Sequence, residues 1–314
     1  MGKLLVVGSI NMDIVKKVRR YPLPGETIKS LDLTYCPGGK GANQAMAIHL
    51  SGCEVYMVGA VGQDPIGKQL LSHFDHLGVN TNNIDVIEGT SGMAFITVNE
   101  RGENHIVISE GANANLSKEN VELVIRNSSW GEGDTVLLQN EIPWTVTKFV
   151  IEQASCKGIQ VVFNPAPALK IPENAFSLID TLILNETEAQ YITGMKISDH
   201  AEALKAIQSL INRGVKEVII TLGENGALYL NQDQDEIFQP AFSVKVVDTT
   251  AAGDTFIGTF IAARGNSYLS TDHCLRFASA AAALTVTRQG AQSSIPTIAE
   301  VETFLSDQVE SRLR

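Results

Sequence analysis

Short apolar, β-branched runs alternate along this chain with segments that have the 3.6-residue periodicity of amphipathic helices. Strands that alternate with helices are typical of βαβ units, so we expect an α/β fold with a mostly parallel central sheet flanked by helices. The expected strands span residues 4–7, 55–61, 135–138, 160–163, 181–184 and 217–222. Helices are expected between most of them, at residues 42–50, 66–77, 120–125, 146–154 and 201–211, and then at 256–263, 273–287 and 298–305.

Two segments interrupt this alternation and predict a small antiparallel β lid. Residues 14–37 carry Pro22, Pro24 and Pro37 among alternating apolar positions, and residues 92–109 have the pattern of a hairpin. Open α/β sheets bind ligands at the carboxyl ends of their strands, where such a flap can cover a site. Surface hairpins without this role are the alternative. Because no linker is long enough to separate independent domains, we expect residues 1–314 to form a single α/β domain that carries the lid.

The composition describes an ordinary globular protein and argues against several classes of partner. Of the 314 residues, 44% are hydrophobic and 19% are charged, which allows a sizeable core. The net charge of −11 argues against binding to nucleic acid or to a membrane surface. No apolar stretch approaches the ~20 residues that span a bilayer. The four cysteines are widely spaced and lack a metal-binding pattern, so we expect a cytoplasmic protein.

The run Asp-Thr-Thr-Ala-Ala-Gly-Asp-Thr-Phe-Ile-Gly at residues 248–258 points most directly to a chemical function. It follows a β-branched stretch at residues 244–247 and leads into an apolar helical pattern, which predicts a strand, a tight turn and a helix. The small side chains of Ala251, Ala252 and Gly253 leave the first amides of that helix uncovered. Unpaired N–H groups at the positive end of the helix dipole suit a phosphate.

One carboxylate, that of Asp254, lies among these amides. Phosphoryl transfer to a hydroxyl needs donors for the moving phosphoryl oxygens and a base for the attacking hydroxyl, and this arrangement offers both. The alternative is that Asp254 merely caps its helix, because Asp is common in a first helical turn.

A second glycine-rich motif, Gly-Gly-Lys-Gly-Ala-Asn-Gln-Ala at residues 38–45, opens the first expected helix. Its glycines let a ligand approach the backbone closely, while Lys40 and Asn43 supply hydrogen-bond donors. A structural glycine turn with an exposed lysine is the alternative.

Together these two motifs resemble the paired signatures of the ribokinase family of carbohydrate kinases. The similarity extends over nearly the whole chain and includes the motifs at residues 8–13, 164–167, 185–188, 221–223 and 287–292. This resemblance implies a ribokinase-like fold and the ATP-dependent phosphorylation of D-ribose at its 5-hydroxyl. Another sugar or nucleoside kinase of the family, acting for example on deoxyribose or fructose, is the closer alternative. A non-catalytic sugar-binding protein on the same fold is the more distant one.

The resemblance also implies roles for individual residues. Asp254 is the expected base, and the amides of Ala252, Gly253 and Asp254 are expected to stabilise the transferred phosphoryl group. The residues expected to hold the sugar hydroxyls are Asn11, Asp13, Gly39, Lys40, Asn43 and Glu141.

ATP and Mg²⁺ are implied at a second group of residues. Asn185 and Glu188 match positions near the nucleotide phosphates and the magnesium ion. An Asn followed three residues later by Glu is also the sequence of a helix capping box, and both interpretations can hold. The other residues implied in nucleotide binding are Thr221, Gly223, Glu224, Gly226, Gly253 and Ser279.

A K⁺ site is implied by the resemblance at two loops beside the expected phosphate site. Ligation by oxygen atoms alone suits a hard cation. The oxygens would come from Asp248, Thr250, Thr285, Arg288, Gly290 and Ser294. The exposed edges of the lid strands, together with the resemblance, further predict a homodimer that pairs lid to lid.

Overall fold

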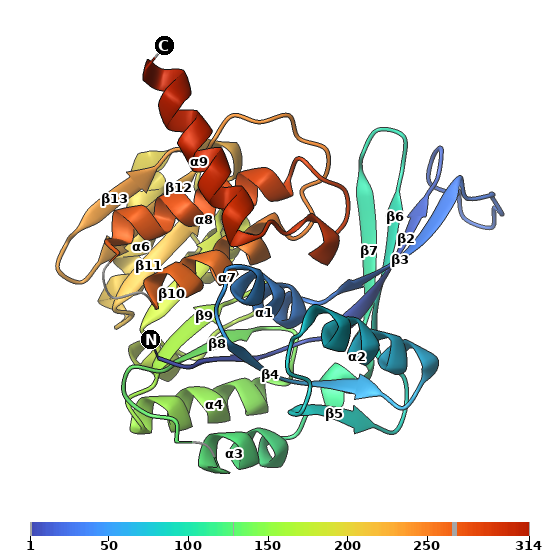
Figure 1. The fold of residues 1–314 in the computed structure, drawn as a ribbon, viewed down its shortest axis with the longest axis horizontal. Coiled ribbons are helices and arrows are strands. Elements are labelled where there is room, and N and C mark those ends of the chain that lie inside the picture. Colours follow the sequence, from blue (N-terminus) through green and yellow to red (C-terminus); the bar gives the residue numbers. More distant parts are fainter. Residues whose placement is uncertain (1, 128, 266–268, 314) are drawn as a thin grey trace.

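The computed structural model describes residues 2–127, 129–265 and 269–313, and its centre is the expected α/β sheet (Figure 1). Across the described residues, nine strands lie in the order β13-β12-β11-β10-β9-β8-β1-β4-β5. Neighbouring strands pair in parallel except at the β11–β12–β13 end, where the pairing is antiparallel. The strands are β1 (Leu4–Val7), β4 (Val55–Gly62), β5 (Ile84–Ile87), β8 (Thr135–Gln139), β9 (Gln160–Asn164), β10 (Thr181–Asn185), β11 (Glu217–Thr221), β12 (Ala227–Asn231) and β13 (Glu236–Gln239).

Helices cover both faces of this sheet, and strand side chains alternate between the two faces. In β1, Leu5 and Val7 belong to one core cluster, while Leu4 and Val6 belong to the other. The first cluster includes residues of α3 (Lys118–Asn127), α4 (Trp144–Cys156), α5 (Glu186–Thr193) and α6 (His200–Asn212). The second includes residues of α1 (Lys40–Leu50), α2 (Pro65–Leu77), α7 (Ala252–Arg264) and α8 (Thr271–Thr285), and α9 (Ile298–Leu313) packs on α8. Because both faces are buried, the strands are apolar runs and not alternating patterns.

The six strands predicted for the central sheet form close to their expected positions. Each of them begins at the predicted residue and ends within one residue of the predicted end. The prediction of a strand at residues 244–247 is wrong, because this segment has no regular secondary structure. The backbone N–H groups of Val247 and Asp248 both donate to the carbonyl of Val286, and Val246 and Val247 are each 58% exposed. The segment is therefore held by the chain that follows α8 and not by the sheet.

To the right of the α/β body in Figure 1, a second sheet forms from the segments expected to build the lid. Within the described residues it has four strands in the order β3-β2-β6-β7. These are β2 (Asn11–Lys17), β3 (Asp32–Gly38), β6 (Gly92–Val98) and β7 (Asn104–Ser109). The two outer pairs are antiparallel, as predicted, and the middle pair β2–β6 is parallel. Since β2 follows closely on β1, the start of this second sheet lies at the carboxyl end of the main sheet.

In the part of the chain that the structure describes, no helix is both long enough and apolar enough to cross a membrane.

Candidate active site

The carboxylate of Asp254 is held by side chains from a different helix. Asp254 is the third residue of α7 and is 9% exposed. Its Oδ2 accepts a hydrogen bond from Asn43 Nδ2 over 3.0 Å, and its Oδ1 accepts one from Gln44 Nε2 over 2.9 Å. Both donors lie on α1. These contacts engage both carboxylate oxygens away from the backbone of α7, so the arrangement differs from that of a helix cap.

The first turn of α7 offers backbone amides to an open space. Among the described residues, a Cβ atom built on Gly253 would meet no heavy atom within 4 Å. Ala251 precedes the helix in the left-handed region, with φ 60°, a conformation that costs an alanine roughly 1–2 kcal/mol. Such strain is often found where a backbone turn is shaped for function.

One of the amides expected in this turn has a partner within the protein. The N–H of Ala252 donates to the carbonyl of Thr249 over 3.3 Å, which corrects the expectation that it is free. The N–H groups of Gly253 and Asp254 lie in the first helical turn, where the helix itself supplies no acceptor. They are the two donors that can face an anion.

Asn11, at the start of β2, is fixed from two sides. A Cβ atom on Gly39, whose φ is 92°, would lie 2.8 Å from the backbone nitrogen of Asn11, so only glycine fits this turn. On the other side, Asn113 Nδ2 donates to Asn11 Oδ1 over 2.7 Å, while Asn113 Oδ1 accepts from the N–H of Ile10 over 2.9 Å. Asn113 is 2% exposed and lies in the short helix η1 (Gly111–Asn115). Sequence reasoning missed it, because a lone Asn after a hairpin carries no local signal.

Glu141 joins the glycine-rich motif to the loop that follows β1. One of its oxygens, Oε2, accepts from the backbone N–H of Lys40 over 3.2 Å and from Ser9 Oγ over 2.5 Å. The side chain of Glu141 thereby lies beside the start of α1, where the other expected sugar-binding residues gather.

Four acidic side chains act electrostatically on one lysine in this site. Burial, reinforced by the carboxylates of Glu141 and Asp254, raises the pKa of Asp13 to about 7 against the opposing effect of Lys40. Burial alone would lower the pKa of Lys40, but the carboxylates of Asp254, Glu141, Glu188 and Asp13 outweigh it and raise this pKa. The Lys40 ammonium is therefore held in its charged form within an acidic cluster.

Asn185 and Glu188 form the capping box that their spacing predicts. Asn185 Oδ1 accepts from the N–H of Glu188 over 2.8 Å, and Glu188 Oε2 accepts from the N–H of Asn185 over 2.9 Å. Burial raises the pKa of the Glu188 carboxyl despite these hydrogen bonds and the nearby Lys40. Lys40 and Asp254 also act electrostatically on Glu188, so the capping box contributes one of the four carboxylates of the acidic cluster.

The expected nucleotide-binding stretch begins at Thr221, which ends β11 beside the end of β10. A Cβ atom on Gly223 would enter open space, as expected for a ligand approach, whereas one on Gly226 would lie 2.1 Å from a backbone oxygen of β13. Gly226 is thus required for packing against β13. Glu224 is exposed, and Ser279 is buried in α8.

The two loops expected to form the cation site are tied together. Asp248 Oδ1 accepts from the N–H of Thr250 over 2.9 Å, and its Oδ2 accepts from the N–H of Gly290 over 3.0 Å. Thr285 Oγ1 donates to Thr255 Oγ1 over 3.2 Å, which links the end of α8, where the second loop begins, to α7 next to Asp254. The remaining expected ligands on that loop are Arg288 and Ser294.

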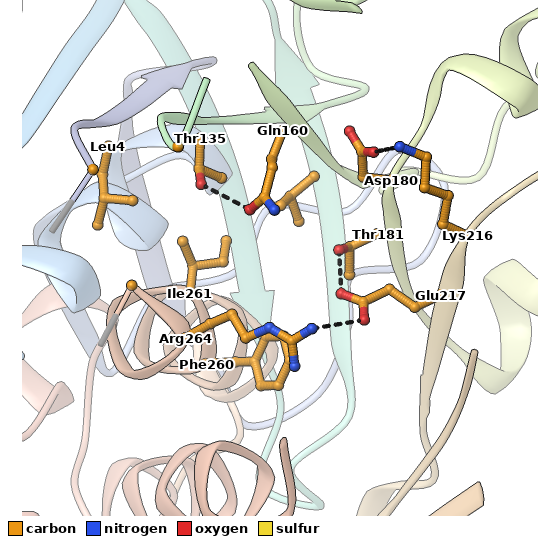
Figure 2. A pocket seen from close by; sticks show the side chains of 14 residues that line it. Leu4, Thr135, Gln160, Asp180, Thr181, Lys216, Glu217, Phe260, Ile261 and Arg264 are labelled. Atoms are coloured by element: carbon orange, nitrogen blue, oxygen red, sulfur yellow. Dashed lines mark hydrogen bonds and ion pairs between the residues drawn. The ribbon is translucent and has the colours of Figure 1, made fainter. Parts of the chain in front are cut away.

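A cavity of about 510 Å³ lies at the opposite edge of the sheet, between the amino ends of the strands and the end of α7 (Figure 2). None of the expected site residues is among the described residues that line it. Lys216 Nζ lies 2.5 Å from Asp180 Oδ1, and Arg264 Nη2 lies 3.1 Å from Glu217 Oε2. Since these charges compensate one another, we assign the cavity no part in the site.

Comparisons with known proteins identify the family of this chain. The family described as pfkB family carbohydrate kinase matches residues 1–298. A ribokinase of Haemophilus influenzae is 41% identical over 305 residues, covering 96% of this chain and 98% of that protein. A deoxyribokinase of Salmonella typhi is 34% identical over 308 residues, covering 96% of this chain and 98% of that protein. The structure of Arabidopsis thaliana ribokinase complexed with ribose and ATP has a TM-score of 0.88 and 34% identity, covering 97% of this chain and 99% of that chain. The chain therefore belongs to the pfkB family of carbohydrate kinases.

Proposed function

We propose that this protein phosphorylates D-ribose at its 5-hydroxyl with ATP, giving D-ribose 5-phosphate and ADP. The observation that carries the proposal is the buried carboxylate of Asp254 in the open first turn of α7, which accepts a hydrogen bond from Asn43 of α1. The relative from Haemophilus influenzae is a ribokinase, and the ribokinase of Arabidopsis thaliana was solved with ribose and ATP. Both support ribose and ATP as the two substrates.

The cluster beside Asp254 has an unfilled hydrogen-bonding capacity that suits a sugar. Asn43 donates to Asp254 through Nδ2, but its Oδ1 is buried and lacks a partner among the described residues. A buried acceptor without a partner costs about 1–3 kcal/mol, and a sugar hydroxyl that donates to Oδ1 removes this cost. The other groups that we propose to bind sugar hydroxyls belong to Asn11, Asp13, Gly39, Lys40 and Glu141.

In the proposed reaction, Asp254 accepts the proton of the 5-hydroxyl as that oxygen attacks the γ-phosphorus of ATP. The bond between the γ-phosphorus and the bridging oxygen breaks, and ADP leaves. Negative charge spreads over the three oxygens of the transferred group, and the N–H groups of Gly253 and Asp254 donate to them. One such donor is worth roughly 3 kcal/mol in the transition state.

The residues present fit Mg²⁺ as the partner of ATP. Glu188 is a buried carboxylate whose pKa is raised by burial, and a cation beside it would compensate its charge. We propose that Asn185 and Glu188 hold the hydrated magnesium ion, which neutralises phosphate charge when bound. Further contacts to ATP are proposed from Thr221, Gly223, Glu224, Gly226 and Ser279.

The two tied loops fit K⁺, because they offer carbonyl and hydroxyl oxygens and no soft ligand. Asp248 bonds to Thr250 in its own loop and to Gly290 in the other, and so holds the two loops together. We propose that potassium, when bound, stiffens the loop that leads into the phosphate-binding turn. Replacing K⁺ with Na⁺ in the assay should then lower turnover.

An ADP-release assay with a panel of acceptors tests the proposed function. Ribose should give the highest kcat/KM, at least about tenfold above 2-deoxyribose, fructose and a nucleoside, since a lost hydroxyl contact costs about 1.4 kcal/mol or more. The second candidate is a deoxyribokinase, which the relative from Salmonella typhi supports, and equal or better use of 2-deoxyribose would favour it. No ADP release with any acceptor would instead favour a sugar-binding protein without catalysis.

We also propose a homodimer formed through the lid. The outer strands β3 and β7 are the edges of the four-stranded sheet within the described residues. They carry four apolar side chains that are between 48% and 67% exposed, those of Leu33, Tyr35, Ile106 and Val107. Exposed apolar edges favour pairing with another sheet.

We further propose a cytosolic location. The proposed reaction consumes ATP, which the cytosol supplies, and all four cysteines, each within the described residues, are free thiols.

A further inference from the structure

We propose that Gln44 is a positioning residue that holds the Asp254 carboxylate in the orientation needed for proton transfer. This inference rests on the proposed function, because it takes Asp254 as the base. Gln44 belongs to the glycine-rich motif at residues 38–45, yet the sequence assigns it no role. Its side chain is 0% exposed, so it acts from within the protein and not from the ligand side.

Gln44 lies at the centre of a chain of buried amides. Asn164 Nδ2 donates to the carbonyl of Ile183 over 2.9 Å, so Asn164 Oδ1 is the atom that accepts from Gln44 Nε2 over 3.1 Å. Gln139 Nε2 donates to Gln44 Oε1 over 2.7 Å. Gln44 can donate to Asn164 and accept from Gln139 in only one orientation of its amide. In that orientation Nε2 also faces Asp254 Oδ1 at 2.9 Å.

Asn43 and Gln44, adjacent on α1, each hold one oxygen of the same carboxylate. A carboxylate offers about four acceptor positions, so two remain for the substrate hydroxyl. Rotation of the carboxylate would break both bonds in a buried site, where unpaired polar groups are costly. The orientation of the base is thus set before the sugar binds, which is the condition for efficient proton transfer.

The two amides differ in what they leave for a ligand. Asn43 keeps a free Oδ1, whereas both N–H groups and the oxygen of Gln44 are engaged by Asp254, Asn164 and Gln139. Gln44 therefore affects the base without contacting the sugar. A change at Gln44 should alter kcat more than it alters KM.

The test compares Gln44→Met with Gln139→Met, two buried amides replaced by side chains of similar length. Both variants, with wild type, are assayed with ribose and ATP at a temperature where thermal melts show all three folded. Gln44→Met should lower kcat by about 10- to 100-fold, the value of a hydrogen bond to a charged group, with both KM values within about threefold of wild type. Gln139→Met keeps the bond between Gln44 and Asp254, so its kcat should fall less than about fivefold.

Equal losses of kcat in the two variants, or a change confined to KM, would overturn the inference. Gln44→Glu supplies a second readout if Gln44→Met does not fold. Its carboxyl donates to Asp254 only when protonated, so its kcat relative to wild type should rise as the pH falls from about 8 to about 6. A ratio independent of pH would speak against positioning. If wild type itself phosphorylates no sugar, the proposed function fails, whereas an active wild type with an equally active Gln44→Met defeats this inference alone.

Discussion

The side-chain amide of Asn43 donates to Oδ2 of Asp254 over 3.0 Å, although 211 positions separate the two residues in the chain. The contact joins the start of α1 to the start of α7 and so brings together the two glycine-rich motifs. Each motif alone allows a structural explanation. Their meeting places a carboxylate, uncovered helical amides and a polar cluster in one site, which is what phosphoryl transfer to a sugar requires.

Replacing Asn43 with alanine should impair both sugar binding and catalysis. Asn43→Ala removes the free acceptor proposed for a sugar hydroxyl and one of the two bonds to Asp254. We expect a ribose KM about tenfold higher and a kcat about tenfold lower, with a nearly unchanged KM for ATP. Asn120→Ala on α3 is the matched control and should retain wild-type kinetics. Wild-type kinetics in Asn43→Ala would exclude its proposed role.

The raised pKa of Asp13 predicts how stability depends on pH. Burial raises this pKa from 3.8 to about 7, so between these values the folded protein holds a proton that the unfolded chain releases. Stability therefore falls as the pH rises through this window, and above about pH 7 the ionised Asp13 costs at most about 4 kcal/mol. Asp13→Asn removes this cost.

Urea unfolding of Asp13→Asn and wild type across this range measures the effect. The variant should be the more stable protein at about pH 8, and the difference should vanish towards about pH 4. The same variant should bind ribose poorly, which would identify Asp13 as a residue that trades stability for function. A stability difference that does not change with pH would contradict the assignment.

Glu188→Gln separates the two roles proposed for Glu188. Gln can replace Glu in a capping box, so the melting temperature should change little. Loss of the carboxylate charge should weaken the response to Mg²⁺ and lower kcat by at least about tenfold. Titrations of activity with Mg²⁺ measure this response. An unchanged magnesium dependence would mean that Glu188 serves only to cap α5.

A charge on the exposed face of β7 should disrupt the proposed dimer. Val107 is 67% exposed on the lid, and Val86 is 56% exposed on β5 of the main sheet. Val107→Glu should shift the protein to monomer in sedimentation at micromolar concentration, while Val86→Glu should leave it dimeric. A wild-type protein that sediments as a monomer would contradict lid-to-lid pairing.

The central strands and the motif residues could be predicted from the sequence because their signals are local. β1 is an apolar run since both its faces are buried, and Asp254 stands in a run of small residues that opens a helix. The β-branched stretch at residues 244–247 has a similar local signal, but its backbone bonds to the carbonyl of Val286 and not to a strand. Strand formation depends on an available neighbour, which no local pattern reveals.

The supports of the site could not be predicted, because they are contacts between distant parts of the chain. Asn113 reaches Asn11 across 102 positions, and Gln44 reaches Asp254 across 210. The occupied amide of Ala252 likewise depends on how the backbone turns at Thr249. Residue type predicted which groups can act, and tertiary packing decides which of them are free to do so.

The central claim is that Asp254 is the base, and turnover of ribose by Asp254→Asn tests it most directly. The variant should fold, with a melting temperature close to that of wild type, and its kcat should fall below about a hundredth of the wild-type value. Retention of more than about a tenth of wild-type turnover, a difference of only about 1.4 kcal/mol, would contradict the claim.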